Sequence, residues 1–132
     1  MAALAVQTHA EVTGKTLDYS PASLQEVEQT LDGFARGGLT SKTNPNTVLM
    51  LGAYLGEVIV RNTGAKWVYV KDLPNGFAGA PPNYLVVQIP GGSAVNPLGK
   101  VAKRLDEGEG DSIVFFYKVI TSDAINEATQ QK

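Results

Sequence analysis

The strongest pattern in the chain is an apolar stretch over residues 48–60 that a single charged residue, Glu57, interrupts. At about 100° per residue, Leu51 and Ile59 fall on one side of a helix and Glu57 falls on the opposite side. Tyr54 projects at the margin between these two sides. The pattern therefore predicts a central helix with a broad buried face.

The same stretch contains two glycines, Gly52 and Gly56, which lie one helical turn apart. A glycine inside a helix costs about 1 kcal/mol relative to alanine. The usual compensation is a close approach of another backbone, which leaves no room for a side chain. We therefore expect another segment of backbone to pack tightly against this part of the helix.

Further helices are predicted on both sides of the central one. The clearest has Leu24, Val27 and Leu31 at helical spacing. Ser23 and Glu26 have the spacing of a capping box at its start. The helices predicted outside the central one cover residues 2–13, 24–36, 97–107 and 112–128.

The segment over residues 112–120 carries two opposing signals. Its content of valine, isoleucine and aromatic residues favours a strand. Asp111 is a good helix N-cap, and the segment continues to residue 128 without a turn signal. We expect a helix here, in agreement with the resemblance described below.

Residues 66–71 and 84–89 alternate in the manner of half-buried strands. They are joined by the loop over residues 73–83, and we expect them to pair as a hairpin. Because two strands alone are only marginally stable, helices must pack on one of their faces. The sequence thus predicts a single α+β domain over residues 1–132, with four to five helices on a small antiparallel sheet of two or three strands.

The ends of this domain are expected to be its least ordered parts. Residues 1–15 form a separate N-terminal segment, and residues 122–132 form a tail that we expect to fray. The apolar start of the chain is too short for the hydrophobic region of a signal peptide, and the run over 48–60 is too short to span a membrane. We therefore expect a cytoplasmic protein that does not enter a membrane.

Composition excludes several kinds of chemistry. The chain has 132 residues and no cysteine, which rules out disulfides, thiolate zinc sites and cysteine nucleophiles. Its formal net charge is −2 and its basic residues are scattered, so we expect no nucleic-acid binding. His9 is the only histidine, and no Gly-x-Ser-x-Gly elbow accompanies any serine. We expect His9 to be exposed, and we expect no metal or cofactor.

Two loops have a superficial likeness to ligand-binding motifs. The acidic turn over residues 106–111 lacks a calcium loop's closing glutamate, because Tyr117 occupies that position. The segment over residues 90–100 is not a phosphate loop, because Ala94 stands at the first required glycine and Val101 follows the lysine. Both are expected to be structural.

A set of motifs carries a family resemblance over most of residues 16–120. The motifs are L-D-Y-S-P-x-S-L at 17–24, L-G-x-Y-L-G-E-V at 51–58, G-x-x-W at 64–67 and N-P-x-x-K-V-x-K-R-L at 96–105. As a set they resemble a group of small, uncharacterised bacterial domains of unknown function, found in scattered accessory genes and sometimes beside toxin genes. The resemblance implies an α+β fold and a protein-binding or immunity-like role, and it provides no catalytic residues.

Glu57 is the main candidate for chemistry. A glutamate within an apolar helix is a candidate general base or ligand contact, but Arg61 four residues later has the favourable position for an ion pair. We expect that pair. The loop with Phe77 is the preferred contact surface, since long loops in compact domains are often functional. The residues expected to contact a ligand or partner are Tyr54, Glu57, Arg61, Trp67, Tyr69, Phe77 and Tyr84.

The leading hypothesis is a non-enzymatic bacterial accessory protein that binds another protein or forms a homodimer. Neutralisation of a toxin is one form that this binding would take. The alternative is a small-ligand-binding protein or weak enzyme with a pocket near Tyr54, Glu57 and Trp67. A closed pocket in which Glu57 lacks Arg61 as its partner would favour the alternative.

Overall fold

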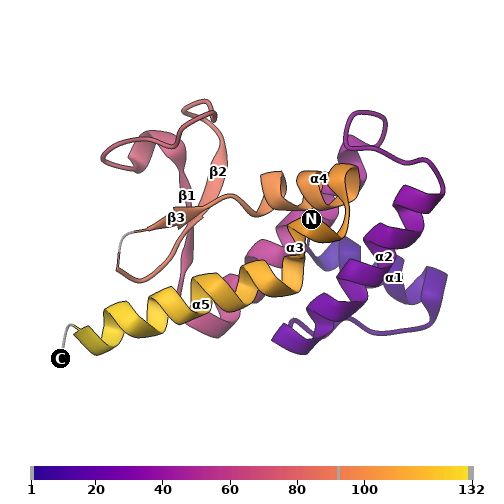
Figure 1. Ribbon diagram of the computed structural model, residues 1–132, viewed down its shortest axis with the longest axis horizontal. Helices are drawn as coiled ribbons and strands as arrows, with labels where there is room; N and C mark the ends of the chain where they lie inside the picture. Colours follow the sequence, from indigo (N-terminus) through magenta and orange to yellow (C-terminus); the bar gives the residue numbers. More distant parts are fainter. Residues whose placement is uncertain (1, 92, 131–132) are drawn as a thin grey trace.

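The computed structural model describes residues 2–91 and 93–130, and the side chains of these residues except those of 12 and 123–130. Within this range the chain forms an α+β domain in which five α-helices accompany a three-stranded antiparallel sheet (Figure 1). The helices are α1 (Ala2–Thr13), α2 (Leu24–Arg36), α3 (Pro45–Thr63), α4 (Pro97–Glu107) and α5 (Ile113–Gln130). The strands are β1 (Lys66–Tyr69), β2 (Leu85–Gln88) and β3 (Ala94–Val95). This is the predicted fold class.

Helix α3 is the centre of the domain. It packs against α1, α4 and α5 and also contacts β1 and β2. The sheet lies at one end of the molecule, and α1 and α2 lie at the other (Figure 1). Tyr54 and Val58 are completely buried together with Leu55 and Ile59, so α3 is buried on more sides than the projection indicated. The prediction that Tyr54 lies at the margin is wrong, because neighbouring elements cover that side as well.

The sheet has the order β1-β2-β3, and both pairings are antiparallel. Trp67 of β1 lies opposite Val87 of β2, which confirms the predicted hairpin. Strand β1 ends at Tyr69 because a 3-10 turn (η2, Val70–Asp72) follows it at once. Strand β3 adds a short second partner to β2 and leads into α4.

The two helix glycines accommodate different neighbours. A Cβ atom on Gly52 would lie 2.8 Å from the Cα atom of Leu98, so α4 approaches the backbone of α3 here as predicted. A Cβ atom on Gly56 would lie 2.1 Å from Cζ2 of Trp67. At this second position the prediction of backbone contact is wrong, because the neighbour is the indole ring.

The start of α2 differs from the predicted capping box. A 3-10 turn (η1, Pro21–Ser23) precedes the helix, and the Ser20 hydroxyl accepts a hydrogen bond from the Ser23 N–H at 3.2 Å. The carboxylate of Glu26 does not close a box. It contacts Lys15 at 3.0 Å and His9 at 3.3 Å, so it ties α1 and the following loop to α2.

The start of α5 also uses residues other than the predicted one. The Ser112 hydroxyl accepts a hydrogen bond from the Phe115 N–H at 3.1 Å, and the Glu28 carboxylate accepts one from the Ile113 N–H. Asp111, the predicted cap, instead pairs with Lys100 at 3.3 Å. The helix itself is confirmed, and its backbone is helical through Gln130, whereas residues 131 and 132 of the tail expected to fray lie outside the described residues.

In the described part of the chain, no helix combines the length and the apolar character that crossing a membrane would require.

Candidate functional site

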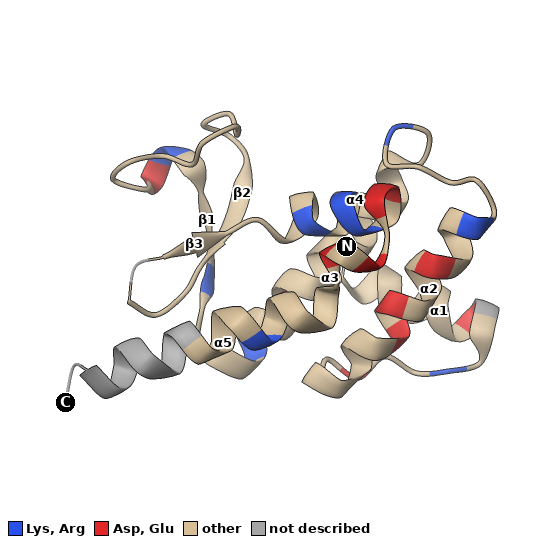
Figure 2. Ribbon diagram, viewed as in Figure 1, with Lys and Arg blue, Asp and Glu red and all other residues tan. Residues whose placement is uncertain are grey.

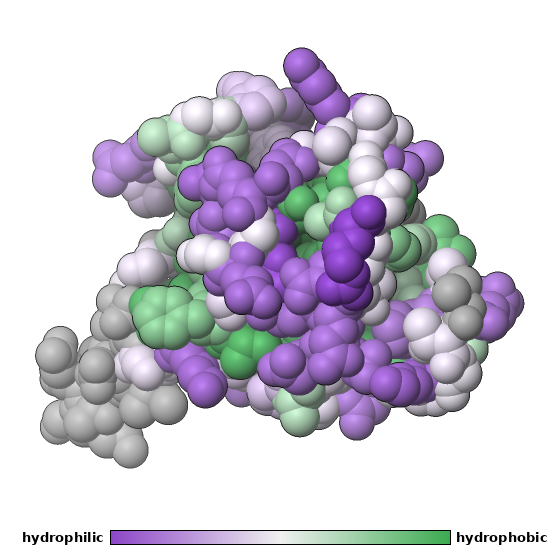
Figure 3. All heavy atoms as spheres, turned by 45° about the vertical axis from the view of Figure 1, so that its right-hand side comes forward, coloured by the Kyte–Doolittle hydropathy of each residue, from purple (hydrophilic) through white to green (hydrophobic). Residues whose placement is uncertain are grey.

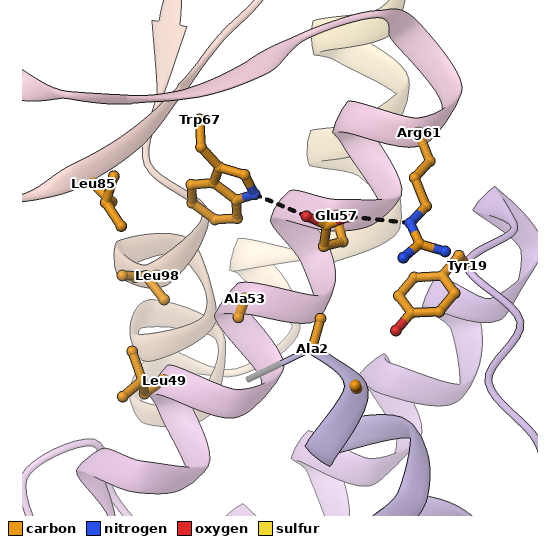
Figure 4. A pocket seen from close by; sticks show the side chains of 10 residues that line it. Ala2, Tyr19, Leu49, Ala53, Glu57, Arg61, Trp67, Leu85 and Leu98 are labelled. Atoms are coloured by element: carbon orange, nitrogen blue, oxygen red, sulfur yellow. Dashed lines mark hydrogen bonds and ion pairs between the residues drawn. The ribbon is translucent and has the colours of Figure 1, made fainter.

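A pocket of about 570 Å³ lies where α3 meets the sheet, α4 and the start of α1. We call it the Trp67 groove. Figure 4 shows Leu49, Leu85, Leu98 and Trp67 along one part of it and Arg61 with Tyr19 along the other. The residues that line the groove are Ala2, Ala3, Tyr19, Leu49, Ala53, Glu57, Arg61, Trp67, Leu85 and Leu98.

The larger part of the Trp67 groove is apolar and open. Leu49 of α3 is 41% exposed and Leu85 of β2 is 38% exposed, although both are large aliphatic residues. Leu98 and the indole of Trp67 are half-buried beside them. The missing side chain at Gly56 leaves the space in which the indole lies. The groove therefore presents an apolar wall that other side chains could cover.

The polar end of the groove is organised by Glu57. Its Oε2 atom accepts a hydrogen bond from Nε of Arg61 at 3.0 Å, which confirms the predicted ion pair. Its Oε1 atom accepts a hydrogen bond from Nε1 of Trp67 at 3.2 Å (Figure 4). Each carboxylate oxygen already has a donor, so the geometry suits Glu57 to orienting Arg61 and Trp67.

Tyr19 is the one non-glycine residue with a positive φ among the described residues, at 63°. This left-handed conformation costs a residue with a Cβ atom about 1 kcal/mol or more, so the surroundings must impose it. The Tyr19 N–H donates to the Tyr54 hydroxyl at 2.9 Å, and the Tyr19 carbonyl accepts from Asn62 at 2.9 Å. These contacts hold the Tyr19 ring below the Arg61 guanidinium, whose Cζ atom lies 3.7 Å from the ring centre.

Tyr54 lies beneath the Trp67 groove and not in its wall. The Ser23 hydroxyl donates to the Ser20 carbonyl at 2.6 Å, so in the 2.6 Å contact between Ser23 and Tyr54 the tyrosine is the donor. The Tyr54 ring also stacks on Tyr19 with 5.1 Å between the ring centres. Burial raises the pKa of the Tyr54 hydroxyl. Tyr54 therefore supports Tyr19, and the expectation that it contacts a ligand directly does not fit its position.

The predicted contact residues do not form one cluster. Glu57, Arg61 and Trp67 meet in the Trp67 groove. Tyr69 is outside it but lies opposite Leu85 in the strand register. Phe77 is half-buried and lines a separate depression of about 500 Å³ within the loop that follows η2. Tyr84, also half-buried, is just before β2, and its carbonyl accepts a hydrogen bond from the Val70 N–H at 2.9 Å.

Sequence reasoning missed the leucines of the groove, Leu49, Leu85 and Leu98, and it also missed Tyr19. Its conformation depends on Tyr54 and Asn62, which are 35 and 43 residues away in the sequence. No helical or strand periodicity includes it. The only available signal was its place in the motif at residues 17–24.

His9 is buried, contrary to expectation, with 6% of its surface exposed. Its Nε2 atom lies 3.3 Å from Oε2 of Glu26, and its Nδ1 atom lies 3.5 Å from Oγ1 of Thr30. Both partners are on α2. The prediction failed because α1 packs into the domain, so that one side of this short helix is covered.

A second arginine–carboxylate cluster lies between α2, α4 and the start of α5. Arg104 is 1% exposed, and it donates from Nε to Glu28 at 3.2 Å and from Nη2 to Asp32 at 2.7 Å. Figure 2 shows acidic residues along α2 and basic residues on α4. Burial disfavours the charge of Arg104, but its bonds to Asp32 and Glu28 outweigh this and raise its pKa. This cluster joins helices, and its cation is buried although Asp32 is partly exposed.

The acidic turn over residues 106–111 is engaged in contacts within the domain. Asp106 accepts hydrogen bonds from the N–H and hydroxyl of Ser41, which lower the pKa of the Asp106 carboxyl. Asp111 pairs with Lys100. The described residues contain no group of three or more His, Asp or Glu side chains placed to hold a metal ion.

No family model matches the chain, and comparisons with curated proteins and with solved structures found no match. The resemblance to small bacterial domains therefore stays a prediction.

Proposed function

We propose that this protein is a non-enzymatic binding module and that the Trp67 groove receives a segment of another protein. The observation that carries this proposal is the exposure of Leu49 and Leu85 around a held indole, beside a single charged end formed by Glu57 and Arg61. Burial of a large aliphatic side chain stabilises a complex by about 1.5–3 kcal/mol. Tryptophan and arginine are the residues most often responsible for binding energy at protein interfaces.

The chemistry of the groove describes its partner. The Arg61 side chain is 53% exposed and uses Nε to bond Glu57. Within the described residues, neither of its terminal nitrogens makes a hydrogen bond, so both are available to a carboxylate of the partner. We therefore expect a partner segment with two kinds of side chain. Apolar side chains would cover the leucine wall, which is formed by Leu49, Leu85 and Leu98, and an acidic residue would pair with Arg61.

The strain at Tyr19 supports the same assignment. Unfavourable backbone conformations persist where the surroundings impose them, and they are concentrated at binding and catalytic sites. Here the strained residue places its ring against the Arg61 guanidinium. The stack limits the motion of Arg61 before binding, and a side chain that is already ordered loses less entropy in a complex.

A different protein fits the groove better than a second copy of this chain. A two-fold contact requires a surface that is complementary to itself, so a protruding element on the same face would have to fill the groove of the other copy. The finer expectations of a bacterial, cytoplasmic accessory protein with an immunity-like role rest on the sequence alone.

Small-ligand binding is the second candidate function, and the size of the groove favours it. Ligand pockets usually enclose about 300–1,000 Å³, a range that includes the 570 Å³ of the Trp67 groove. Catalysis has weaker support, because Glu57 is occupied by Arg61 and Trp67.

The test is affinity capture from the native host with the unmodified protein, with the double variant Leu49→Glu/Leu85→Glu, and with Phe115→Glu. Phe115 is the matched control, since it is 67% exposed on α5 and lies outside the groove. Figure 3 shows that hydrophobic side chains also gather at the lower left of the molecule, so α5 is a fair competing surface.

The proposal expects a protein that the unmodified chain and Phe115→Glu retain and the double variant loses. A captured protein that only Phe115→Glu loses would move the interface to α5. Recovery of no partner, together with a thermal shift caused by a metabolite and abolished by the double variant, would replace protein binding with ligand binding.

A further inference from the structure

A second pocket of about 310 Å³ lies between α1, α2 and α3, apart from the Trp67 groove. We propose that this His9 pocket binds a small apolar molecule that carries one hydrogen-bond donor, such as a phenol or an indole. The residues that line the His9 pocket are Ala5, Thr8, His9, Thr13, Thr30, Gly33, Phe34, Met50 and Leu51. None of them lines the Trp67 groove, so this proposal is independent of the proposed function.

The size and composition of the His9 pocket determine the class of ligand. Its volume is at the lower end of the range of ligand sites, which excludes nucleotides and peptides. Its large apolar residues are Phe34, Met50 and Leu51, and its polar side chains are three threonines and one imidazole. A charged ligand would lose its hydration without an opposite charge in the pocket wall, whereas a small apolar one gains by leaving water.

The contacts of His9 assign its tautomer and thereby the polar group of the ligand. One carboxylate oxygen of Glu26 lies beside Nε2 of His9, and the other accepts a hydrogen bond from Lys15. The hydrogen bond from Lys15 lowers the pKa of the Glu26 carboxyl, so Glu26 is ionised at neutral pH and can only accept hydrogen bonds. When the imidazole is neutral, its hydrogen therefore lies on Nε2, and Nδ1 is an acceptor.

This acceptor is only weakly used by the protein. The contact between Nδ1 and Oγ1 of Thr30 is 3.5 Å long, beyond the usual range of hydrogen bonds. A ligand O–H or N–H that reaches Nδ1 would make a shorter bond. His9 and Thr30, the residue beside Nδ1, both line the pocket, so the proposal places this acceptor at the pocket wall.

Gly33 offers a position at which a larger side chain is expected to obstruct the His9 pocket without damaging the fold. It lies at the exposed rim of the pocket, and a Cβ atom placed on it would meet no atom within 4 Å. It is also inside α2, where replacement of glycine favours the helix. Gln29→Leu is the matched control, because Gln29 is exposed on the same helix and does not line the pocket.

The experiment titrates the full chain with phenol, and separately with toluene, and follows backbone amide and histidine NMR signals. Phenol is expected to shift signals around His9 and to bind about five- to tenfold more tightly than toluene, because only phenol donates to Nδ1. Gly33→Leu is expected to weaken phenol binding at least about tenfold. Gln29→Leu and Leu49→Glu are expected to bind phenol as the unmodified protein does.

Three results would overturn the proposal. They are the absence of any phenol-dependent shift near His9, equal binding of phenol and toluene, and unchanged phenol binding by Gly33→Leu. Loss of phenol binding in Leu49→Glu would place the phenol in the Trp67 groove and would also reject the His9 pocket. The partner-capture experiment uses variants of the Trp67 groove and of α5, and none of the residues they change lines the His9 pocket, so failure of one proposal is distinguishable from failure of the other.

Discussion

Two arginines of this protein each bond carboxylates, but one arginine is buried and the other is exposed. Arg104 is buried and bonds Glu28 and Asp32 from another helix, whereas Arg61 is half-exposed and bonds Glu57 within its own helix. Removal of charge from water is costly unless partners compensate it, so the buried cluster is dependent on every one of its bonds. The exposed pair gains little stability and retains donors for another molecule.

The two arginines also differ in how far along the sequence their carboxylate partners lie. Glu28 lies 76 residues from Arg104 and 85 residues from Ile113, whose N–H it also accepts. The buried cluster thus fixes α4 and the start of α5 against α2. The exposed pair spans four residues and joins no distant helices by itself. We conclude that the Arg104 cluster maintains the fold, whereas the Arg61 pair keeps exposed the donors that the proposed recognition requires.

The largest expected effect comes from Arg104→Ala. This variant leaves Glu28 and Asp32 without their cation, and loss of one partner of a buried ion pair typically costs about 3–5 kcal/mol. Urea unfolding monitored by circular dichroism measures the free energy of unfolding. Asp32→Asn is the control, since it keeps the shape and the Glu28 contact and is expected to cost less. If Arg104→Ala lowered the free energy of unfolding by less than about 1 kcal/mol, the buried cluster would contribute no more than an exposed ion pair. The contrast in stability between Arg104 and Arg61 would then disappear.

The next largest change in stability is expected when the Trp67 indole, which bonds Glu57 of the exposed pair, is displaced. Gly56→Ala places a methyl group 2.1 Å from Cζ2 of Trp67, so the ring must move away from Glu57. Overpacking of this kind costs about 1–3 kcal/mol, which outweighs the gain of about 1 kcal/mol in helix propensity. Trp67 is the only tryptophan, so its fluorescence reports the displacement directly.

Gly33→Ala is the matched control for Gly56→Ala. Its new methyl group meets no atom within 4 Å, so only the helix-propensity gain applies and stability rises by up to about 1 kcal/mol. If both alanine variants were stabilised equally, the indole would not be held by the glycine and the groove would be looser than described.

Local patterns predicted those features whose causes are local. The helices over residues 24–36 and 97–107 follow from apolar spacing, and Glu57 and Arg61 are neighbours on one helix. The hairpin also follows from alternation in two nearby segments. These features depend on residues that lie close together in the sequence.

Features that depend on tertiary packing were missed. Tyr54 is buried because elements distant in sequence cover its side of α3, and His9 is buried because its partners come from α2. The strained Tyr19 depends on contacts more than thirty residues away. Periodicity reports which positions share a face, but it does not report how many faces are covered.

The third prediction tests the link between the core and the exposed pair. Tyr54→Phe removes the hydroxyl that holds Tyr19 below Arg61, and loss of its hydrogen bonds is expected to cost about 1–2 kcal/mol. Amide exchange at Tyr19 should accelerate, and the Arg61 side chain should become more mobile by NMR. A variant as stable as the unmodified protein would show that Tyr19 does not need Tyr54.

The same variant has a signature at alkaline pH. Burial raises the pKa of Tyr54 above its ordinary value of 10.0, so the folded chain holds this proton more firmly than the unfolded chain. The resulting stabilisation is complete below pH 10 and is lost as pH rises through the higher folded pKa. Tyr54→Phe should reduce this loss without abolishing it, since burial also raises the pKa of Tyr117. Unfolding measured from pH 8 to pH 12 would detect the difference.

The smallest effect on stability, and the one most specific to function, is expected for Arg61→Ala. An exposed ion pair contributes about 0–1 kcal/mol, so the free energy of unfolding should hardly change. Partner capture should nevertheless fall sharply, because an interfacial arginine that meets a carboxylate often contributes 2 kcal/mol or more. Arg61→Lys keeps the charge but loses the planar donor pair and the stack on Tyr19, so it should not restore full capture. Equal capture by the unmodified protein, Arg61→Ala and Arg61→Lys would show that recognition uses the leucine wall alone. The two arginines would then differ in burial but not in function.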